Sequence, residues 1–353
     1  MNNAEFLTQI WNLEYTDRPG LIVEESINYE PLPTPQSGLT YLEEVCQNAL
    51  RFYKSLVVRD DNVPAIDAYR GSYIAATVFG ARERVFEDGH RYLEGPIIFN
   101  ASDVDRIKKP SALSALMGEQ IEMIRRCADQ THGECWIRCG DIQNPLGVAA
   151  MLWDTSTFYP ALVEEPQRVH KLLEIITEVT VEYITQMKAV RPKLVPLDWP
   201  KVWIPADRGI YLADDTMTMV SPELYEEYGV TYNNRIGGEF GGILLHTCSL
   251  KERYFKSILK NEGLHSINFA AQYSSDMQKI FEFFGGKAVI LPHYVHTDHP
   301  QIGTLPEFID LVLDCWIPER PAIIYVSAKP DGGYQPEVFE VFKRRGFSIK
   351  HPS

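Results

Sequence analysis

Residues 209–249 read GIYLADDTMTMVSPELYEEYGVTYNNRIGGEFGGILLHTCS, and they determine our interpretation of the fold. The segment contains two apolar runs of strand length. The first run ends at Asp214 and Asp215, and the second ends at His246 and Cys248. In a barrel of parallel strands, the carboxyl ends of the strands surround the active site. We therefore expect these four side chains to lie at the mouth of a barrel.

From about Pro64 onward, short β-rich runs alternate with helical patterns. Between most runs, apolar residues recur at intervals of three and four, and segment 165–190 places Pro166 at the first helical position. Repeated β–α units predict parallel strands joined by helical crossovers, and about eight units close into a barrel. We predict an α/β fold, a (β/α)8 TIM-like barrel over residues 63–353. The predicted strands are 63–69, 135–140, 194–198, 209–215, 242–248, 265–270, 288–295 and 322–327.

Two segments interrupt the alternation of strands and helices. Residues 1–62, which include Pro31, Pro33 and Pro35, are predicted to form an N-terminal extension packed on the barrel. The glycines of RIGGEFGGILL do not follow a strand, and the segment lacks the Lys-Ser/Thr ending of a phosphate-binding loop. We interpret that segment as a flexible connection before the strand at 242–248. Ser221 is predicted to be the N-cap of the helix that follows it, with Pro222 at the first helical position.

Composition limits the classes of partner. A net charge of -14 opposes binding to nucleic acid, because such binding depends on Lys and Arg that neutralise phosphates. The apolar runs are shorter than the ~20 residues that a membrane-spanning helix needs. Six cysteines in 353 residues are too sparse for a disulfide framework. We expect a cytoplasmic protein that acts on a small molecule, and a homodimer is one assembly consistent with this composition.

The pair His246 and Cys248 is the strongest candidate for a metal site. Residues two apart on an extended chain face the same side, so one imidazole and one thiolate can bind the same soft metal ion, such as zinc. A third ligand has to come from elsewhere. The segment LPHYVHTDHP offers His293, His296 and His299, of which His293 points into the mouth if the run is extended.

The order of motifs resembles the uroporphyrinogen decarboxylase superfamily. The matching segments are NPLGVAAML, EEPQRVHKLLEIITEVTVEYITQ, DDTMTMVSPELYEEY, ILLHTCS, FGGKAVILPHY and GTLPEFIDLVLD, within residues 92–336. The resemblance implies a (β/α)8 barrel. It also implies one of two chemistries, namely decarboxylation or zinc-dependent methyl transfer with a corrinoid protein.

This chain departs from both branches of the superfamily. An Arg-rich N-terminal segment of the decarboxylases is missing, and the position of their loop tyrosine falls near Met151. The methyltransferases hold zinc with His-x-Cys plus a later cysteine, whose position falls near Ser327. Cys315 is the only downstream cysteine, and its segment reads as an outer helix. We therefore rank His293 and Asp214 ahead of Cys315 as the third zinc ligand.

Further candidates follow from their positions at predicted strand ends. We expect Asp214 and Asp215 to be catalytic, because loops at this face build barrel active sites. Helix capping and hydrogen bonding within loops is the competing interpretation for such acids. The candidates for substrate binding are Asp67, Asp198, Trp199, Tyr211 and Met151.

These observations lead to one principal hypothesis and two alternatives. The principal hypothesis is a zinc-dependent methyltransferase that moves a methyl group between a small substrate or thiol and a corrinoid on a separate partner protein. A decarboxylase-like lyase that uses the acids without a metal is the first alternative. A non-catalytic barrel that binds a ligand is the second.

Overall fold

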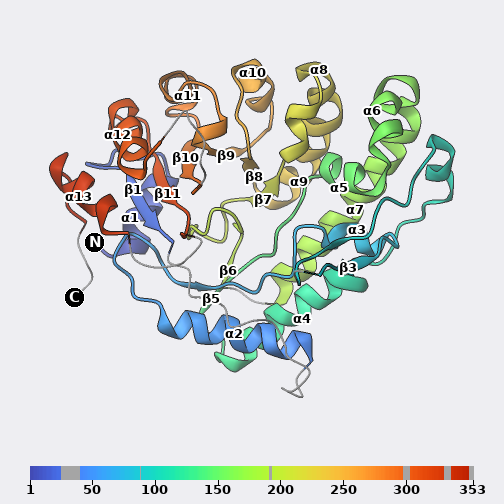
Figure 1. Cartoon of the computed structure of the whole chain (residues 1–353), viewed down its shortest axis with the longest axis horizontal. Helices are drawn as coiled ribbons and strands as arrows, with labels where there is room; N and C mark the ends of the chain where they lie inside the picture. Colours follow the sequence, from blue (N-terminus) through green and yellow to red (C-terminus); the bar gives the residue numbers. More distant parts are fainter. Residues whose placement is uncertain (25–39, 88, 191–192, 297–302, 330–334, 350–353) are drawn as a thin grey trace.

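The computed structural model describes residues 1–24, 40–87, 89–190, 193–296, 303–329 and 335–349. Figure 1 shows a ring of helices around a central group of strands. The proline-containing segment 31–35 and His299 lie outside the described residues. The helices are α1 (Asn3–Trp11), α2 (Tyr41–Ser55), α3 (Ile74–Val78), α4 (Ala115–Gln130), α5 (Pro145–Leu152), α6 (Thr155–Glu164), α7 (Pro166–Val190), α8 (Pro222–Tyr225), α9 (Thr231–Phe240), α10 (Phe255–Ile258), α11 (Met277–Phe284), α12 (Leu305–Cys315) and α13 (Pro336–Arg344).

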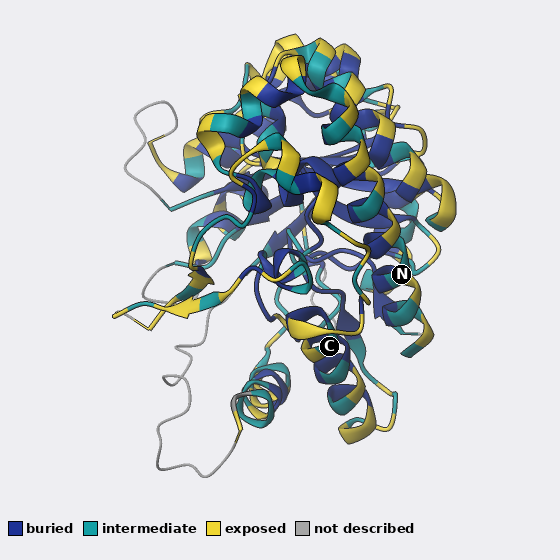
Figure 2. Cartoon of the chain, turned by 90° about the vertical axis from the view of Figure 1, so that its right-hand side faces the viewer, coloured by how far each residue is buried: buried dark blue, intermediate teal, exposed yellow. Residues whose placement is uncertain are grey.

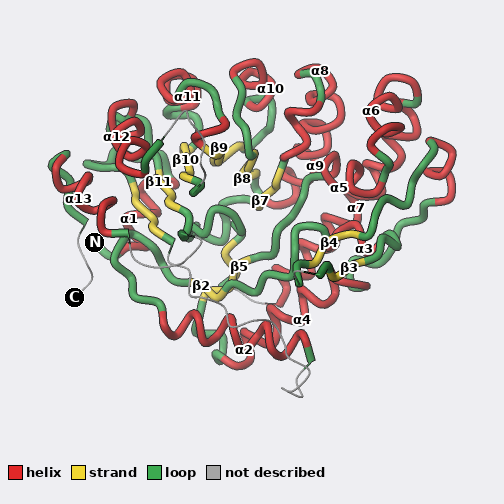
Figure 3. Tube along the Cα trace, viewed as in Figure 1, coloured by secondary structure: helices red, strands yellow, loops and turns green. Residues whose placement is uncertain are grey.

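The strands form two parallel sheets and a hairpin (Figure 3). The larger sheet has the order β1-β11-β10-β9-β8-β7, the smaller has the order β2-β5-β6, and β3 pairs antiparallel with β4. Every predicted strand run contains a strand of the two parallel sheets. The strands are β1 (Gly20–Val23), β2 (Ala65–Ile66), β3 (Glu83–Val85), β4 (Arg91–Leu93), β5 (Trp136–Arg138), β6 (Leu194–Val195), β7 (Ile210–Ala213), β8 (Ile243–Thr247), β9 (Leu264–Ala270), β10 (Val289–Tyr294) and β11 (Ile323–Val326).

Backbone hydrogen bonds connect the two parallel sheets at both edges. The amide of Tyr211 donates to the carbonyl of Pro196 at 2.8 Å, which joins β7 to the segment after β6. The amide of Asp61 donates to the carbonyl of Leu21 at 3.0 Å, which joins the segment before β2 to β1. The strands therefore follow one another around a TIM-like barrel, as the sequence predicts.

Burial explains why these runs form barrel strands. All residues of β7, β8, β10 and β11 are buried, which is typical of parallel strands covered by helices on one side and by core side chains on the other. Figure 2 shows these dark, buried strands inside a helical layer whose outer surface is exposed. None of the described helices combines the length and the apolar character needed to cross a membrane.

Predicted helix starts are confirmed at two positions. Helix α7 begins at Pro166, and α8 begins at Pro222 after Ser221, whose hydroxyl accepts from the amide of Leu224. Pro suits the first helical position because its missing N–H would have no intrahelical partner there.

The glycine-rich segment before β8 is helical, which corrects the prediction of a flexible connection. Helix α9 includes Gly237 and Gly238 and extends to Phe240, and Gly241 follows with a left-handed φ of 80°. A Cβ at position 237 would lie 2.9 Å from Cγ2 of Ile243. The glycine therefore permits close packing of the helix on β8 rather than flexibility.

The first 62 residues contribute directly to the sheet through β1. This strand pairs in register with β11, from Gly20 opposite Ile323 to Val23 opposite Val326. The indole of Trp11 in α1 donates to the carbonyl of Trp203 at 2.9 Å. The domain boundary at residue 62 stays a prediction.

Candidate metal centre and adjoining cleft

Asp215, His246 and Cys248 form a compact group of three metal-ligand types. One donor atom from each lies within 4.8 Å of the other two. Nε2 of His246 is 3.5 Å from Oδ1 of Asp215 and 3.7 Å from Sγ of Cys248. The amide of Cys248 also donates to Oδ1 of Asp215 at 3.1 Å.

The positions of these side chains follow from the strand ends. His246 is the penultimate residue of β8, and Cys248 follows the strand directly. β7 ends at Ala213, and after one intervening residue Asp215 begins a short helical turn. In the sheet register, His246 lies opposite Ala213 of β7 on one side and Asn268 of β9 on the other. Parallel strands thus bring the predicted acid and the His-x-Cys pair to one edge.

Asn268 fixes the orientation of the His246 ring. Its amide nitrogen donates to the carbonyl of Leu291 at 2.6 Å, so its oxygen faces Nδ1 of His246 at 2.5 Å and accepts from it. Nε2 is left facing Asp215 and Cys248. Partners of this kind select the histidine tautomer that binds a metal. The sequence analysis missed Asn268, although a polar residue within the apolar run HSINFA marks it.

The electrostatics of the group couple the acid to the imidazole. Burial alone lowers the pKa of His246, but hydrogen bonds with Asp215 and Cys248 raise it to about 10. Burial raises the pKa of Asp215, but the hydrogen bond with His246 and the histidine's positive charge lower it to about 2. The group therefore favours a positive charge beside the carboxylate.

Nitrogen, sulfur and oxygen donors at this separation fit zinc. Zinc binds Cys, His and carboxylate ligands tetrahedrally, and a catalytic zinc site has three protein ligands and one open position. Asp215 is the third side chain of the group here. Its side chain is 42% exposed, and Cys248 is also exposed, so the open side of the group faces solvent.

His293 lies beside this group, against Asn268. Its Nδ1 is 3.2 Å from the amide nitrogen of Asn268, and its ring centroid is 5.9 Å from that of His246. Burial, followed by the charge of His246, lowers the pKa of His293 to about 3 and keeps it neutral. His293 is not one of the three clustered donors, and its role as a ligand stays a prediction.

Asp214, which the sequence analysis ranks as a possible third ligand, is not one of the three clustered donors. It is fully buried, and its carboxylate accepts from Nδ2 of Asn233 at 3.3 Å. Burial raises its pKa to about 7. Its backbone amide donates to the carbonyl of His246 at 2.8 Å, which ties β7 to β8. A catalytic role for Asp214 stays a prediction.

The other downstream candidates lie outside the three-residue group. Cys315 is buried at the end of α12, on the helix that its segment predicts. Nε2 of His296 is 3.0 Å from the carbonyl of Ser327.

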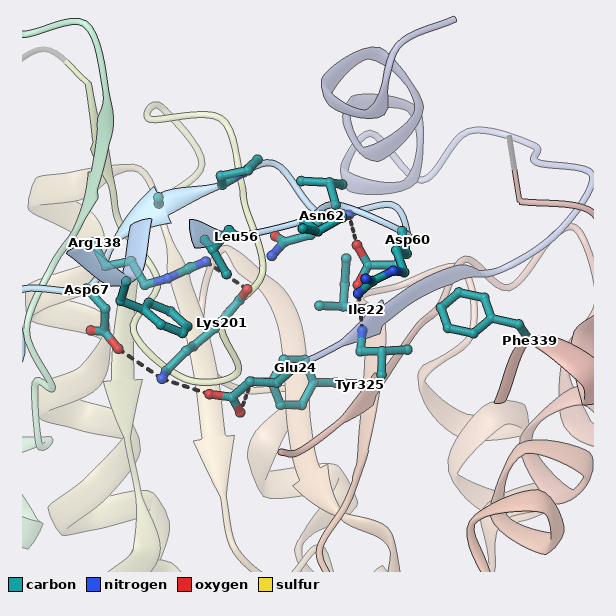
Figure 4. A pocket seen from close by; sticks show the side chains of 17 residues that line it. Ile22, Glu24, Leu56, Asp60, Asn62, Asp67, Arg138, Lys201, Tyr325 and Phe339 are labelled. Atoms are coloured by element: carbon teal, nitrogen blue, oxygen red, sulfur yellow. Dashed lines mark hydrogen bonds and ion pairs between the residues drawn. The ribbon is translucent and has the colours of Figure 1, made fainter. Parts of the chain in front are cut away.

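Asp67 lines a separate pocket whose walls include both apolar and charged side chains (Figure 4). Nζ of Lys201 is 2.9 Å from the carboxylate of Asp67 and 2.8 Å from that of Glu24. The hydroxyl of Tyr325 donates to Glu24 at 2.7 Å. Asp67 is thus one partner of a mostly buried ion pair inside the barrel, and its role in substrate binding stays a prediction.

Three other predicted substrate residues line the barrel interior. Trp199 packs edge-on against His293 and Tyr325, with ring centroids 5.9 Å and 5.3 Å apart. Tyr211 is buried, with its ring 6.3 Å from that of His246. Asp198 is also buried, and burial raises its pKa well above the usual range.

A wide cleft opens beside the metal-ligand group. Its walls include Asp215 together with Tyr69, Tyr92, Asp141, Met151 and Trp153, and its volume is about 690 Å³. Asp215 therefore belongs to both the cleft and the group of donors. Met151, predicted to contact substrate, lies in the cleft wall, on α5.

The sequence analysis missed Asp141, which follows β5. Nε2 of Gln143 donates to its two carboxylate oxygens at 3.2 and 3.3 Å. Burial raises the pKa of Asp141 to about 7, whereas the charge of His246 opposes that rise. CWIRCG is predicted to be a strand that ends at Gly140, and Asp141 follows it directly. Its position after a predicted strand could therefore have marked Asp141 as a candidate site residue.

Comparison with known proteins agrees with this architecture. A family model described as Uroporphyrinogen decarboxylase (URO-D) matches residues 69–190, about a third of the chain. No curated protein matches the sequence. The chain is similar in structure to a methyltransferase from Methanosarcina mazei, with a TM-score of 0.71 and 13% sequence identity over 98% of this chain and 99% of that one.

These matches support the uroporphyrinogen decarboxylase superfamily. The family model agrees with the resemblance inferred from the sequence motifs over residues 69–190, and the structural similarity at 13% identity agrees with the predicted fold. The family-model match ends before Asp215, His246 and Cys248. The chemistry of those residues therefore has to be argued from their geometry.

Proposed function

We propose that this protein is a zinc-dependent methyltransferase of the uroporphyrinogen decarboxylase-like type. It would move a methyl group between a small thiol and a corrinoid carried by a partner protein. The observation that supports the proposal best is the grouping of Asp215, His246 and Cys248 within 4.8 Å, beside an open cleft.

Each residue has a distinct part in the proposed site. Cys248 supplies a soft thiolate, His246 supplies Nε2 in an orientation held by Asn268, and Asp215 supplies an oxygen. Zinc, when bound, would lower the pKa of a substrate thiol so that it is a thiolate at neutral pH. Asp215 belongs to the donor group and also lines the cleft. A thiol that enters the cleft would therefore approach the donor group from its solvent-facing side.

The proposed methyl transfer needs no reactant other than the thiol and the methylated corrinoid. A carbon–sulfur bond forms while the carbon–cobalt bond of the methylated corrinoid breaks, and the electron pair of the broken bond stays on cobalt. The thiol proton passes to solvent. The reverse reaction moves the methyl group from sulfur to cobalt.

The test combines metal analysis with a methyl-transfer assay. Protein dialysed after exposure to zinc should retain about one ion per chain, measured by inductively coupled plasma mass spectrometry. Methyl transfer between methylcobalamin and a panel of small thiols is then followed by cobalamin absorbance. Protein that retains no zinc and changes no cobalamin spectrum would rule the proposal out.

A metal-independent lyase is the second candidate, favoured by Asp141. A carboxyl group whose pKa is raised to about 7 in a cleft wall is suited to proton transfer near neutral pH. Activity that survives both chelation and Cys248→Ala would support this candidate over the methyltransferase.

A further inference from the structure

The cleft beside the metal-ligand group has a one-sided charge. Asp141, Asp154 and Asp215 contribute carboxylates to its wall. Among the described residues that line it, none is a lysine, an arginine or a histidine. Carboxylates that share a poorly solvated site repel one another unless a cation lies among them. The cleft therefore disfavours an anionic ligand and favours a cationic one.

Aromatic rings provide a second feature suited to a cation. Tyr69 is 44% exposed and Tyr92 is 42% exposed, and both line the cleft. Exposed aromatic rings attract ammonium groups through the negative potential of the ring face. The rings and the carboxylates are contributed by different segments, so the combination does not arise from a single acidic stretch.

The two arginines next to the cleft tyrosines in sequence, Arg70 and Arg91, bind to acids outside the cleft wall. Arg70 pairs with Glu83 at 2.8 Å and with Glu119 at 2.9 Å. Arg91, adjacent to Tyr92 in β4, pairs with Glu83 at 2.9 Å. These ion pairs direct the two guanidinium groups toward Glu83. Among the cleft carboxylates, Asp215 lies 3.5 Å from Nε2 of His246, and the charge of His246 also acts on Asp141.

We propose that the small thiol substrate carries an ammonium group, which lies against Asp141, Tyr69 and Tyr92 while its sulfur faces Asp215, His246 and Cys248. The sulfur end of this assignment rests on the proposed methyltransferase function. The ammonium end rests on the cleft alone. The substrate class is therefore an aminothiol rather than an acidic or neutral thiol.

The first experiment tests the cleft without zinc or sulfur. Propylamine, 1-propanol and 1-propanesulfonate have the same three-carbon chain and carry a positive charge, no charge and a negative charge. Their equilibrium binding to metal-free protein is measured by saturation-transfer NMR titration. We expect the ammonium compound to bind about tenfold more tightly than the alcohol, which corresponds to one cation–π or ionic contact, and the sulfonate to bind most weakly.

Matched variants locate this preference in the molecule. Asp141→Asn keeps an oxygen that accepts from Gln143 but removes the charge, and it should reduce the preference for the amine to less than threefold. Asp207→Asn removes an exposed acid from the loop that precedes β7, at the opposite end of the strand from Asp215, and should leave the preference unchanged. Equal binding of amine and alcohol, or equal losses in the two variants, would overturn the inference.

A second series separates this inference from the proposed function. The thiols 2-aminoethanethiol, 2-mercaptoethanol and 2-mercaptoethanesulfonate are titrated into zinc-loaded protein by calorimetry. Each thiol should bind more tightly than its sulfur-free counterpart in wild-type protein and not in Cys248→Ala, with the aminothiol tightest. A preference for the amine with no gain from sulfur would support the ammonium site and count against the zinc–thiol function.

Discussion

Oδ1 of Asp215 lies 3.5 Å from Nε2 of His246, and the same oxygen accepts from the amide of Cys248. One carboxylate oxygen therefore contacts both residues of the His-x-Cys pair. Because β7 and β8 are adjacent and parallel, an acid after the first strand and a thiol after the second reach the same point. Asp215 thus completes, with His246 and Cys248, a group of three side chains that could hold a metal ion.

Asp215→Asn should fold normally and bind zinc more weakly. The amide keeps an oxygen that can accept from Cys248 but loses the negative charge that favours a cation. We expect an affinity loss of about 10–100-fold, the range found when partners of a metal site are removed. Zinc titration against a competing chelator measures this loss, and a circular dichroism spectrum checks the fold. If the variant is instead mostly insoluble, and its folded fraction binds zinc as tightly as the wild type, Asp215 has a structural role.

Cys248→Ser should lower the zinc content markedly, because thiolate is the softer ligand. Cys248 is exposed, so the substitution removes a donor without disturbing the core. Cys135→Ser is the matched control, since Cys135 is only partly buried and lies outside the group of donors. Equal zinc stoichiometry in the two variants would exclude Cys248 as a ligand.

Asn268→Ala should reduce both zinc affinity and stability. The change removes the acceptor for Nδ1 of His246 and the donor to the carbonyl of Leu291, which leaves buried polar groups without partners. We expect a loss of about 1–3 kcal/mol in the free energy of unfolding and about 10–100-fold in zinc affinity. Urea unfolding and chelator competition give the two values. Full zinc affinity in the variant would show that Asn268 does not orient the ring.

Two adjacent glycines in α9 should respond oppositely to alanine. A Cβ at Gly237 meets Ile243 at 2.9 Å, whereas a Cβ at Gly238 meets nothing within 4 Å. We expect Gly237→Ala to lower the free energy of unfolding by about 1–2 kcal/mol, since overpacking exceeds the gain in helix propensity. Gly238→Ala should raise it by up to about 1 kcal/mol. Urea denaturation compares the two variants, and identical effects would contradict the close packing of α9 on β8.

Glu83→Gln should destabilise the protein in a pH-dependent way. Burial raises the pKa of Glu83, but hydrogen bonds with Arg70 and Tyr73 lower it to about 2, from 4.5. A carboxyl group whose pKa is lowered on folding stabilises the folded state above about pH 4.5. This stabilisation is lost as the pH falls toward 2. At pH 7 we expect Glu83→Gln to lower the free energy of unfolding by about 2 kcal/mol. This value lies between those typical of exposed and of buried ion pairs.

The measurement for Glu83 is urea unfolding of both proteins from pH 7 to pH 3. The difference between wild type and variant should be constant down to about pH 4.5 and should shrink below it. A difference that is the same at pH 3 and pH 7 would mean that Glu83 contributes packing rather than charge.

The sequence contained enough information for the barrel and for part of the site. The apolar runs that end at Asp215 and Cys248 predicted β7 and β8 with ends within two residues of those observed, because hydrophobic periodicity is a local property. The polar Asn268 is visible within its apolar run, but its contact with His246 could not be predicted, because that contact depends on the register of β8 against β9. Asp141 was missed for a similar reason, since the approach of its loop to the group is set by packing. The helical state of Gly237 also depends on a contact with another element.

The pairing of β1 with β11 has a consequence for biosynthesis. Residues 20–23 leave the ribosome early, but their partners at residues 323–326 are made about 300 residues later. Until then the nascent chain carries an apolar strand whose hydrogen-bonding edge has no partner within the sheet. Closing such a long loop is slow, and exposed strand edges promote association between chains. We therefore expect β1 to be among the last strands to acquire its native partner as the chain is synthesised.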